Sequence, residues 1–230
     1  MKKLIIASNN KSKIAEIAEI LGGYFEVVSM KDAGLNIDIE ETGVTFEQNA
    51  VIKAKACFEH TGLPSLADDS GLEVEALNGA PGVYSADYAT LCRGDFNPGN
   101  YGHFSHIPRF GGIDYMPSVS LGKTSRNNKI PKDDQNIDAL LSQMKNFADR
   151  RARFVCVMAL CNGGDDVVFG KGMTEGRILS RRTGTGGFGY DPIFWSNDLL
   201  QSFGEASPQS KNKVSHRRRA LDDLLKRLPK

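Results

Sequence analysis

The sequence predicts an α/β fold, and three observations favour this class. The chain opens with the pattern of a strand, a helix and a second strand over residues 4–30. Helical and strand patterns continue to alternate after it, which is typical of helices packed on a sheet. The 230 residues are 40% hydrophobic and 25% charged, as in an ordinary globular protein. This length fits one large domain, or two small lobes that share a core.

The first elements follow from hydrophobic spacing. The apolar run at residues 4–7 predicts a buried strand, and one of the polar residues at 8–10 can cap the helix after it. Apolar residues then recur at helical spacing until Gly22, and residues 25–30 predict the second strand. The opening is therefore βαβ-like.

A second helix is predicted at residues 45–59. Thr45 and Gln48 have the spacing of a capping box at its start. Asn49 and Lys53 lie four residues apart in this helix, so both side chains can project from the same face.

Short strands are expected next, at residues 64–67 and 72–77, on either side of an acidic pair and with Gly71 allowing a turn. Residues 90–133 carry six glycines, four prolines and five aromatic residues without sustained periodicity. We interpret these residues as an inserted excursion within a single domain of residues 1–230. Its aromatic residues indicate that it packs against another surface, such as that of a partner subunit.

Regular patterns resume after the excursion. A helix is predicted around residues 137–147, followed by paired strands at 153–160 and 167–171 that are joined by a glycine-containing hairpin turn. The last helix begins at about Ser215.

Composition limits the possible functions. The net charge of +1 provides no overall field for nucleic acid or an anionic membrane. The amino-terminal apolar run is too short for a signal peptide or a membrane span. The four cysteines form no Cys-x-x-Cys pair, which favours a reduced cytoplasmic protein with free thiols.

Two acidic pairs, Glu40-Glu41 and Asp68-Asp69, are candidate metal ligands, because carboxylate oxygens suit Mg²⁺. Neighbouring side chains on a strand point to opposite faces, so we expect one member of each pair to face a site. The other member would support it through hydrogen bonds. A glutamate pair alone is usually solvated surface, and this is the better explanation of Glu40-Glu41 taken in isolation. The aspartate pair follows an apolar run and is harder to explain in that way.

A donor-rich segment at the first helix start is a candidate phosphate site. Its residues are Ser8, Asn9, Asn10, Lys11, Ser12 and Lys13. Backbone N–H groups at a helix start favour anions, and Lys13 would add a point charge. The same residues would equally serve as an ordinary helix cap followed by solvated lysines. With the acidic pairs, they indicate a metal-dependent enzyme that acts on a phosphorylated substrate.

Two carboxyl-terminal segments complete the candidates. The glycine-rich run at 184–194 contains an aromatic residue and an aspartate, which suit recognition of a flat base, although a tight hairpin with a core phenylalanine explains it as well. Arginines at 217–219 crowd the positive end of a helix, the unfavourable end for cations, and no compensation is visible in the sequence. The alternative is that they are solvated.

Seven motifs occur in an order that resembles the Ham1/RdgB family of inosine/xanthosine triphosphate pyrophosphatases. They are the segments 8–13, 40–46, 49–50, 67–72, 79–85, 186–192 and 215–217. The resemblance implies a long mixed central sheet flanked by helices, two lobes with a substrate cleft between them, and a homodimer. It also implies Mg²⁺-dependent hydrolysis of non-standard purine nucleoside triphosphates (ITP, dITP, XTP) to the monophosphate and pyrophosphate.

The resemblance also implies roles for single residues. Glu40 and Asp69 would bind the metal, and Asp69 would accept a proton from the attacking water. Residues 8–13 would hold the triphosphate, and Ser70 would contact the substrate. The residues expected around the base are Phe188, Gly189, Tyr190, Asp191, Lys211, His216 and Arg217. The expected supporting residues are Glu41, Asn49, Lys53 and Asp68.

The chain departs from the family pattern in the excursion and at Asp87, where relatives usually carry a basic residue. Two alternatives to the pyrophosphatase therefore stay open. One is a different Mg²⁺-dependent phosphohydrolase, acting on modified pyrimidine or sugar nucleotides. The other is a nucleotide-binding protein whose turnover the excursion has blocked.

Overall fold

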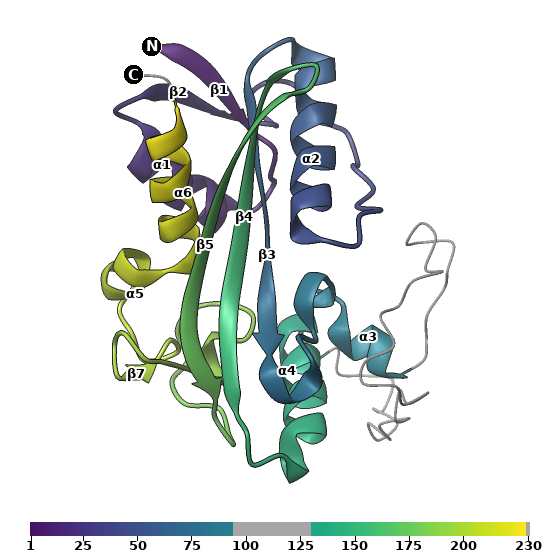
Figure 1. Cartoon of the computed structure of the whole chain (residues 1–230), viewed down its shortest axis with the longest axis vertical. Helices are drawn as coiled ribbons and strands as arrows, with labels where there is room; N and C mark the ends of the chain where they lie inside the picture. The colour runs from purple at the N-terminus through teal and green to yellow at the C-terminus, as the bar shows by residue number, and fades with distance from the viewer. Residues whose placement is uncertain (94–129, 229–230) are drawn as a thin grey trace. The chain divides into compact units, whose positions relative to one another are not determined.

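The computed structural model describes residues 1–93 and 130–228, and these confirm the α/β class (Figure 1). Their sheet has seven strands in the order β2-β1-β3-β4-β5-β6-β7. β1 runs parallel to β2 and β3, whereas β6 is antiparallel to β5 and β7, so the sheet is mixed. The strands are β1 (Lys2–Ile6), β2 (Phe25–Ser29), β3 (Ser65–Val74), β4 (Arg151–Gly163), β5 (Asp166–Ile178), β6 (Phe194–Ser196) and β7 (Gln201–Ser202).

The helices of the described residues follow the predicted pattern, except that α3 and α5 were not predicted. They are α1 (Lys11–Leu21), α2 (Phe46–Thr61), α3 (Tyr88–Arg93), α4 (Lys132–Gln143), α5 (Pro208–Val214) and α6 (His216–Arg227), with 3-10 turns at Glu75–Leu77, Gly82–Tyr84, Met144–Asn146 and Asp191–Ile193. The predicted capping box is present: Thr45 and Gln48 each bond to the other's backbone N–H. Within the described chain, every helix falls short of the length and apolar content that a membrane span requires.

The chain forms two compact units. Unit 1 comprises Met1–Ser70, Val155–Met173 and Ser215–Lys230, and unit 2 comprises Gly71–Phe154 and Thr174–Val214. In unit 1, α1 and α6 pack on one face of the strands and α2 packs on the other (Figure 1). Leu66 of β3 belongs to the first of these cores and Ala67 to the second, as the alternation of a strand requires.

Glycines on β5 explain how α6 packs so closely in unit 1. A Cβ atom on Gly172 would lie 2.2 Å from the carbonyl oxygen of His216, and one on Gly170 would lie 2.3 Å from that of Ala220. The prediction that this strand ends at residue 171 was wrong, because β5 continues to Ile178. Its buried positions are partly glycines, which hide the alternation of apolar and polar residues.

In unit 2, α3 and α4 pack on a core with stacked and tilted aromatic rings. The rings of Phe154 and Phe194 lie 4.6 Å apart, and Phe203 packs against both. Buried Asn136 of α4 donates to the carbonyl oxygen of Ala86 and accepts from the N–H of Ala89, which fixes α3 to α4.

Two predictions about chain breaks need correction. The two short strands around the aspartate pair are one strand, β3, which runs through Gly71 without a turn. The ends of the predicted excursion are helical, since residues 90–93 lie in α3 and residues 132–133 in α4. Residues 94–129 lie outside the described residues. Asp87 forms a 2.6 Å ion pair with Lys132 of α4.

Candidate active site

β3 presents Asp68 and Asp69 to opposite faces of unit 1, as strand alternation predicts. Asp68 follows the direction of Leu66 toward α1 and α6, and Asp69 follows that of Ala67 toward α2. Both carboxylates are buried, with 3% and 9% of each residue exposed. Buried carboxylates require partners, and the partners on the two faces differ.

Asp68 lies between two cations. Lys13 Nζ donates to Asp68 Oδ2 at 2.9 Å, and Arg217 Nε lies 3.5 Å from the same oxygen. Ser70 Oγ donates to it at 3.3 Å. Burial acts to raise the pKa of Asp68, but Lys13 and Arg217 outweigh it and hold that pKa well below its usual range. Asp68 is therefore ionised at neutral pH.

Glu16 completes this network, and the sequence analysis did not single it out. Arg217 Nη1 donates to Glu16 Oε2 at 2.6 Å, and Ser215 Oγ donates to Glu16 Oε1 at 2.8 Å. The only sequence signal is an acid three residues after Lys13, on the same side of α1.

The structure shows the compensation for the arginines at the start of α6 that is not visible in the sequence: each of them has an acceptor. Arg217 is 2% exposed and pairs with Glu16 and Asp68. Arg218 pairs with Asp222 one turn along α6, and Arg219 Nη1 donates to the carbonyl oxygen of Met173. His216 is buried beside Arg217 in unit 1.

Asp69 contacts two residues of α2. Asn49 Nδ2 donates to Asp69 Oδ2 at 3.2 Å, and Lys53 Nζ lies 3.4 Å from Asp69 Oδ1. Burial raises the pKa of Asp69 to about 6, although Lys53 acts in the opposite direction. Asn49 and Lys53 were predicted to project from the same face of their helix, and this is the face of α2 that contacts Asp69.

Glu41 is connected to Asp69 through Lys53, whose ammonium group contacts both carboxylates. Lys53 Nζ donates to Glu41 Oε2 at 2.8 Å. Burial lowers the pKa of Lys53, but Asp69 and Glu41 outweigh it and raise that pKa, so the lysine is charged. Glu41, predicted as support, is thus linked to Asp69 through Lys53, and both Glu40 and Glu41 are exposed.

Two side chains of the donor-rich segment, residues 8–13, cap the start of α1 by accepting from backbone N–H groups. Asn10 Oδ1 accepts from the N–H of Lys13 at 3.2 Å, and Ser8 Oγ accepts from the N–H of Asn10 at 3.2 Å. Asn9 is exposed. Lys11 and Ser12 form the first turn of α1, and their side chains lie outside the described part of the chain. Lys13 alone links this segment to the aspartate pair through a side-chain contact described here.

The predicted base-binding residues of the glycine-rich run lie in unit 2. Asp191 is buried, forms an ion pair with Lys211, and accepts from the N–H of Phe188 at 2.8 Å. Lys211 Nζ lies 4.4 Å from the centre of the Phe188 ring, which is 43% exposed. Tyr190 Oη donates to the carbonyl oxygen of Ser85. An exposed ring backed by a cation is a surface on which a flat base can stack.

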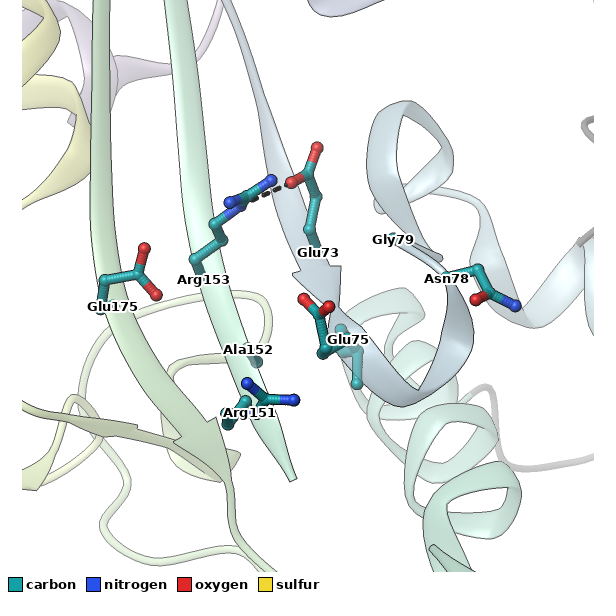
Figure 2. Close-up of a pocket in the computed structure, with 9 residues that line it drawn as sticks. Glu73, Glu75, Asn78, Gly79, Arg151, Ala152, Arg153 and Glu175 are labelled. Carbon is teal, nitrogen blue, oxygen red and sulfur yellow. Dashed lines mark hydrogen bonds and ion pairs between the residues drawn. The ribbon is translucent and has the colours of Figure 1, made fainter. Parts of the chain in front are cut away.

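Unit 2 also has a polar pocket of about 420 Å³, and none of the predicted site residues lines it (Figure 2). Glu73, Glu75, Arg151, Arg153 and Glu175 point toward one another there. Arg153 donates to Glu73 at 2.8 Å, and Arg151 pairs with Asp149 at 2.7 Å. Both guanidinium groups are thus neutralised within unit 2, and we assign the pocket no part in the site.

The side chains near Asp69 fit a hard cation held by few protein ligands. No group of three or more His, Cys, Asp or Glu side chains that could hold a metal occurs in residues 1–93 and 130–228. Mg²⁺ is commonly held by one or two carboxylates together with phosphate oxygens and water. Asp69 and Glu41, which share Lys53 as a partner, are carboxylates of the type that such an arrangement uses.

Comparison with known proteins gives consistent matches over nearly the whole chain. The model of the Ham1 family matches residues 4–104 and 113–227. A dITP/XTP pyrophosphatase of Christiangramia forsetii is 40% identical, covering 99% of this chain and 100% of the relative. One from Staphylococcus aureus is 37% identical over 97% and 95% of the two chains. The solved structure of a HAM1 protein from Coxiella burnetii aligns with a TM-score of 0.74 at 35% identity, covering 97% of this chain and 96% of that one.

Proposed function

Because the chain belongs to the Ham1 family, we propose that it hydrolyses non-standard purine nucleoside triphosphates, dITP, ITP and XTP, to the nucleoside monophosphate and pyrophosphate. Relatives of the same length that are named dITP/XTP pyrophosphatases support the substrate class. The observation that carries the proposal in this chain is Asp69, a buried carboxylate with a raised pKa and two donors from one helix.

Asp69 has the properties of a proton acceptor for the attacking water. A general base works best when its pKa lies close to the working pH, and burial moves the pKa of Asp69 in that direction. Asn49 fixes one oxygen of the carboxylate and Lys53 lies beside the other, so the group is held in one orientation. We assign Asp69 this role, with Asn49 and Lys53 as its supports.

Asp69 and Glu40 are the proposed Mg²⁺ ligands, with Glu41 close by on Lys53. When bound, the cation would neutralise triphosphate charge and orient water. Lys13 and the capped start of α1, residues 8–13, would hold the triphosphate, and Ser70 would contact it. Asp68 keeps Lys13 in place, because the two form a 2.9 Å ion pair.

Phe188 is the proposed stacking surface for the base, with Gly189, Tyr190, Asp191 and Lys211 as its frame. Asp191 is engaged within unit 2 by Lys211 and by the N–H of Phe188, which supports a role in shaping the loop. His216 and Arg217 are proposed donors to the 6-oxo group. A donor-lined site would reject adenine, whose amino group would leave those donors unpaired.

Three further parts of the proposal follow from family membership. We propose Mg²⁺ as the cofactor, a homodimer as the assembly, and a cytoplasmic location with no nucleic-acid or membrane partner. The four cysteines are free and buried, which is compatible with a reducing compartment. Light scattering on the purified protein tests the assembly. A homodimer predicts twice the mass of one chain.

A substrate panel tests the function. XTP, dITP, ITP, GTP, ATP and dUTP are each supplied with Mg²⁺, and pyrophosphate and orthophosphate are both measured. We expect pyrophosphate from the first three and roughly tenfold slower turnover of ATP, since donors left unpaired by the adenine amino group cost about 1–3 kcal/mol. GTP keeps the 6-oxo group, so its turnover tests whether the site also discriminates against a 2-amino group. Orthophosphate as the sole primary product would contradict the proposal. Tight binding of XTP without turnover would instead indicate a nucleotide-binding protein.

A further inference from the structure

The glycine-rich loop of unit 2, residues 184–190, is attached to the first turns of α4. The N–H of Gly189 donates to Asp133 Oδ2 at 2.9 Å. Arg182, just before the loop, donates to the carbonyl oxygen of Asp134 at 3.1 Å and pairs with Asp138 at 2.7 Å. The proposed function gives α4 no role, yet α4 contacts this loop both at its start and at its tip.

The two ends of the loop and its tip are held by different kinds of bond. The base of the loop is fixed by backbone hydrogen bonds, from the N–H of Thr183 to the carbonyl oxygen of Pro192 and from the N–H of Gly186 to that of Gly204. At the tip, the N–H groups of Phe188 and Gly189 donate to side-chain carboxylates. The position of the tip therefore depends on those two carboxylates.

Glycines make the tip especially dependent on its hydrogen bonds. Gly187 and Gly189 have φ values of +77° and +56°, in the left-handed region. Glycine moves freely between this region and others, so its conformation is set by the contacts around it. Phe188 lies between these two glycines, and a shift of the Gly189 amide moves the Phe188 ring with it.

The two carboxylates at the tip are not equivalent. Asp191 is buried and paired with Lys211, within the proposed base site. Asp133 is exposed on α4 and reaches the loop through the Gly189 amide. Substitution of Asp133 therefore changes the loop without removing a group that contacts the base.

We propose that Asp133 is a positioning residue for base recognition: its carboxylate fixes the Gly189 amide and, through it, the Phe188 ring on which the base stacks. This inference rests on the proposed function, because it assigns specificity to that same site. The contact requires an acceptor and not a charge, since the partner is a backbone N–H. Asparagine can therefore replace Asp133, and alanine cannot.

Steady-state kinetics with XTP and saturating Mg²⁺ test the proposal. Asp133→Ala should raise KM about fivefold and leave kcat within about twofold, which is the size expected for loss of one hydrogen bond. Asp133→Asn should restore the wild-type KM. Asp134→Ala is the matched control on the next residue. It should behave as wild type because, within the described residues, its side chain reaches Arg182 at 3.4 Å and not the tip of the loop.

Hydrogen–deuterium exchange gives a second readout that is independent of turnover. Peptides that cover residues 184–190 should exchange faster in Asp133→Ala than in wild type, and at the wild-type rate in Asp133→Asn and Asp134→Ala. An unchanged exchange rate in Asp133→Ala would contradict the proposal that the Asp133–Gly189 hydrogen bond fixes the loop. Faster exchange together with a wild-type KM would contradict the role of Asp133 in base recognition. If wild-type protein releases no pyrophosphate from any purine nucleotide, the proposed function fails, while the exchange experiment still tests the contact separately.

Discussion

Asp68 and Asp69 are neighbours on β3, but the two faces of unit 1 place them in opposite electrostatic environments. On the α1 and α6 face, Lys13 and Arg217 hold Asp68 in its charged form. On the α2 face, burial dominates and raises the pKa of Asp69 to about 6. A saturated ion-pair network stabilises structure, whereas a carboxylate with a raised pKa suits proton transfer. The comparison therefore supports the proposal that Asp68 stabilises the fold and Asp69 takes part in the chemistry.

The largest expected effect separates chemistry from folding. Asp69→Asn should lower kcat about a thousandfold, within the range of about 10²–10⁴ for loss of a general base. The melting temperature should not fall, because the substitution removes a buried charge without changing shape. Asp165→Asn, at a fully exposed aspartate in the same unit, is the control. Wild-type turnover by Asp69→Asn under saturating Mg²⁺ would refute the role of Asp69.

Asp68→Asn should show the reverse pattern. It removes the buried partner of Lys13 and one of the two carboxylates that pair with Arg217 in the described network, so the free energy of unfolding should fall by about 3 kcal/mol. Urea denaturation monitored by circular dichroism measures this change. An Asp68→Asn variant as stable as wild type would mean that the network contributes nothing to the fold.

Gly172→Ala should disturb the ion pairs of Asp68 indirectly, through the position of α6. The added Cβ would lie 2.2 Å from the carbonyl oxygen of His216, so α6 must move and carry Arg217 with it. We expect a loss of about 2 kcal/mol in unfolding free energy, the usual cost of overpacking. Gly23→Ala is the control, since its Cβ would meet no atom within 4 Å. Equal stability of the two variants would contradict the close packing of α6 on β5.

Lys13→Met should have the smallest effect and should act on binding. Arg217 still pairs with Asp68, so stability should fall less than in Asp68→Asn. The KM for XTP should rise about tenfold, which corresponds to loss of one charge-assisted hydrogen bond to phosphate. Initial rates across a range of XTP concentrations measure it. An unchanged KM would remove Lys13 from the proposed triphosphate site.

Local rules were enough to predict the parts of the molecule that local interactions determine. The capping box at Thr45 and Gln48 lies within one helical turn, and the opposite faces of Asp68 and Asp69 follow from the geometry of any strand. The shared face of Asn49 and Lys53 followed in the same way from helical spacing, and both contact Asp69.

Contacts between distant segments could not be predicted in this way. Glu16 and Arg217 lie 201 residues apart, so the compensation of the α6 arginines is visible only in three dimensions. The full length of β5 was hidden because Gly172 occupies a position that packing against α6 keeps small. The attachment of Gly189 to Asp133 joins residues 56 apart, with β4 and β5 between them in the chain.

The most direct test of this account compares the two aspartates in one experiment. Pyrophosphate release from XTP is measured for Asp68→Asn and Asp69→Asn at saturating Mg²⁺ and substrate, at a temperature where both variants are folded. We predict that Asp68→Asn turns over at least tenfold faster than Asp69→Asn, because only the latter lacks the general base. Equal turnover by the two variants, or faster turnover by Asp69→Asn, would contradict the division of roles between the two faces of β3.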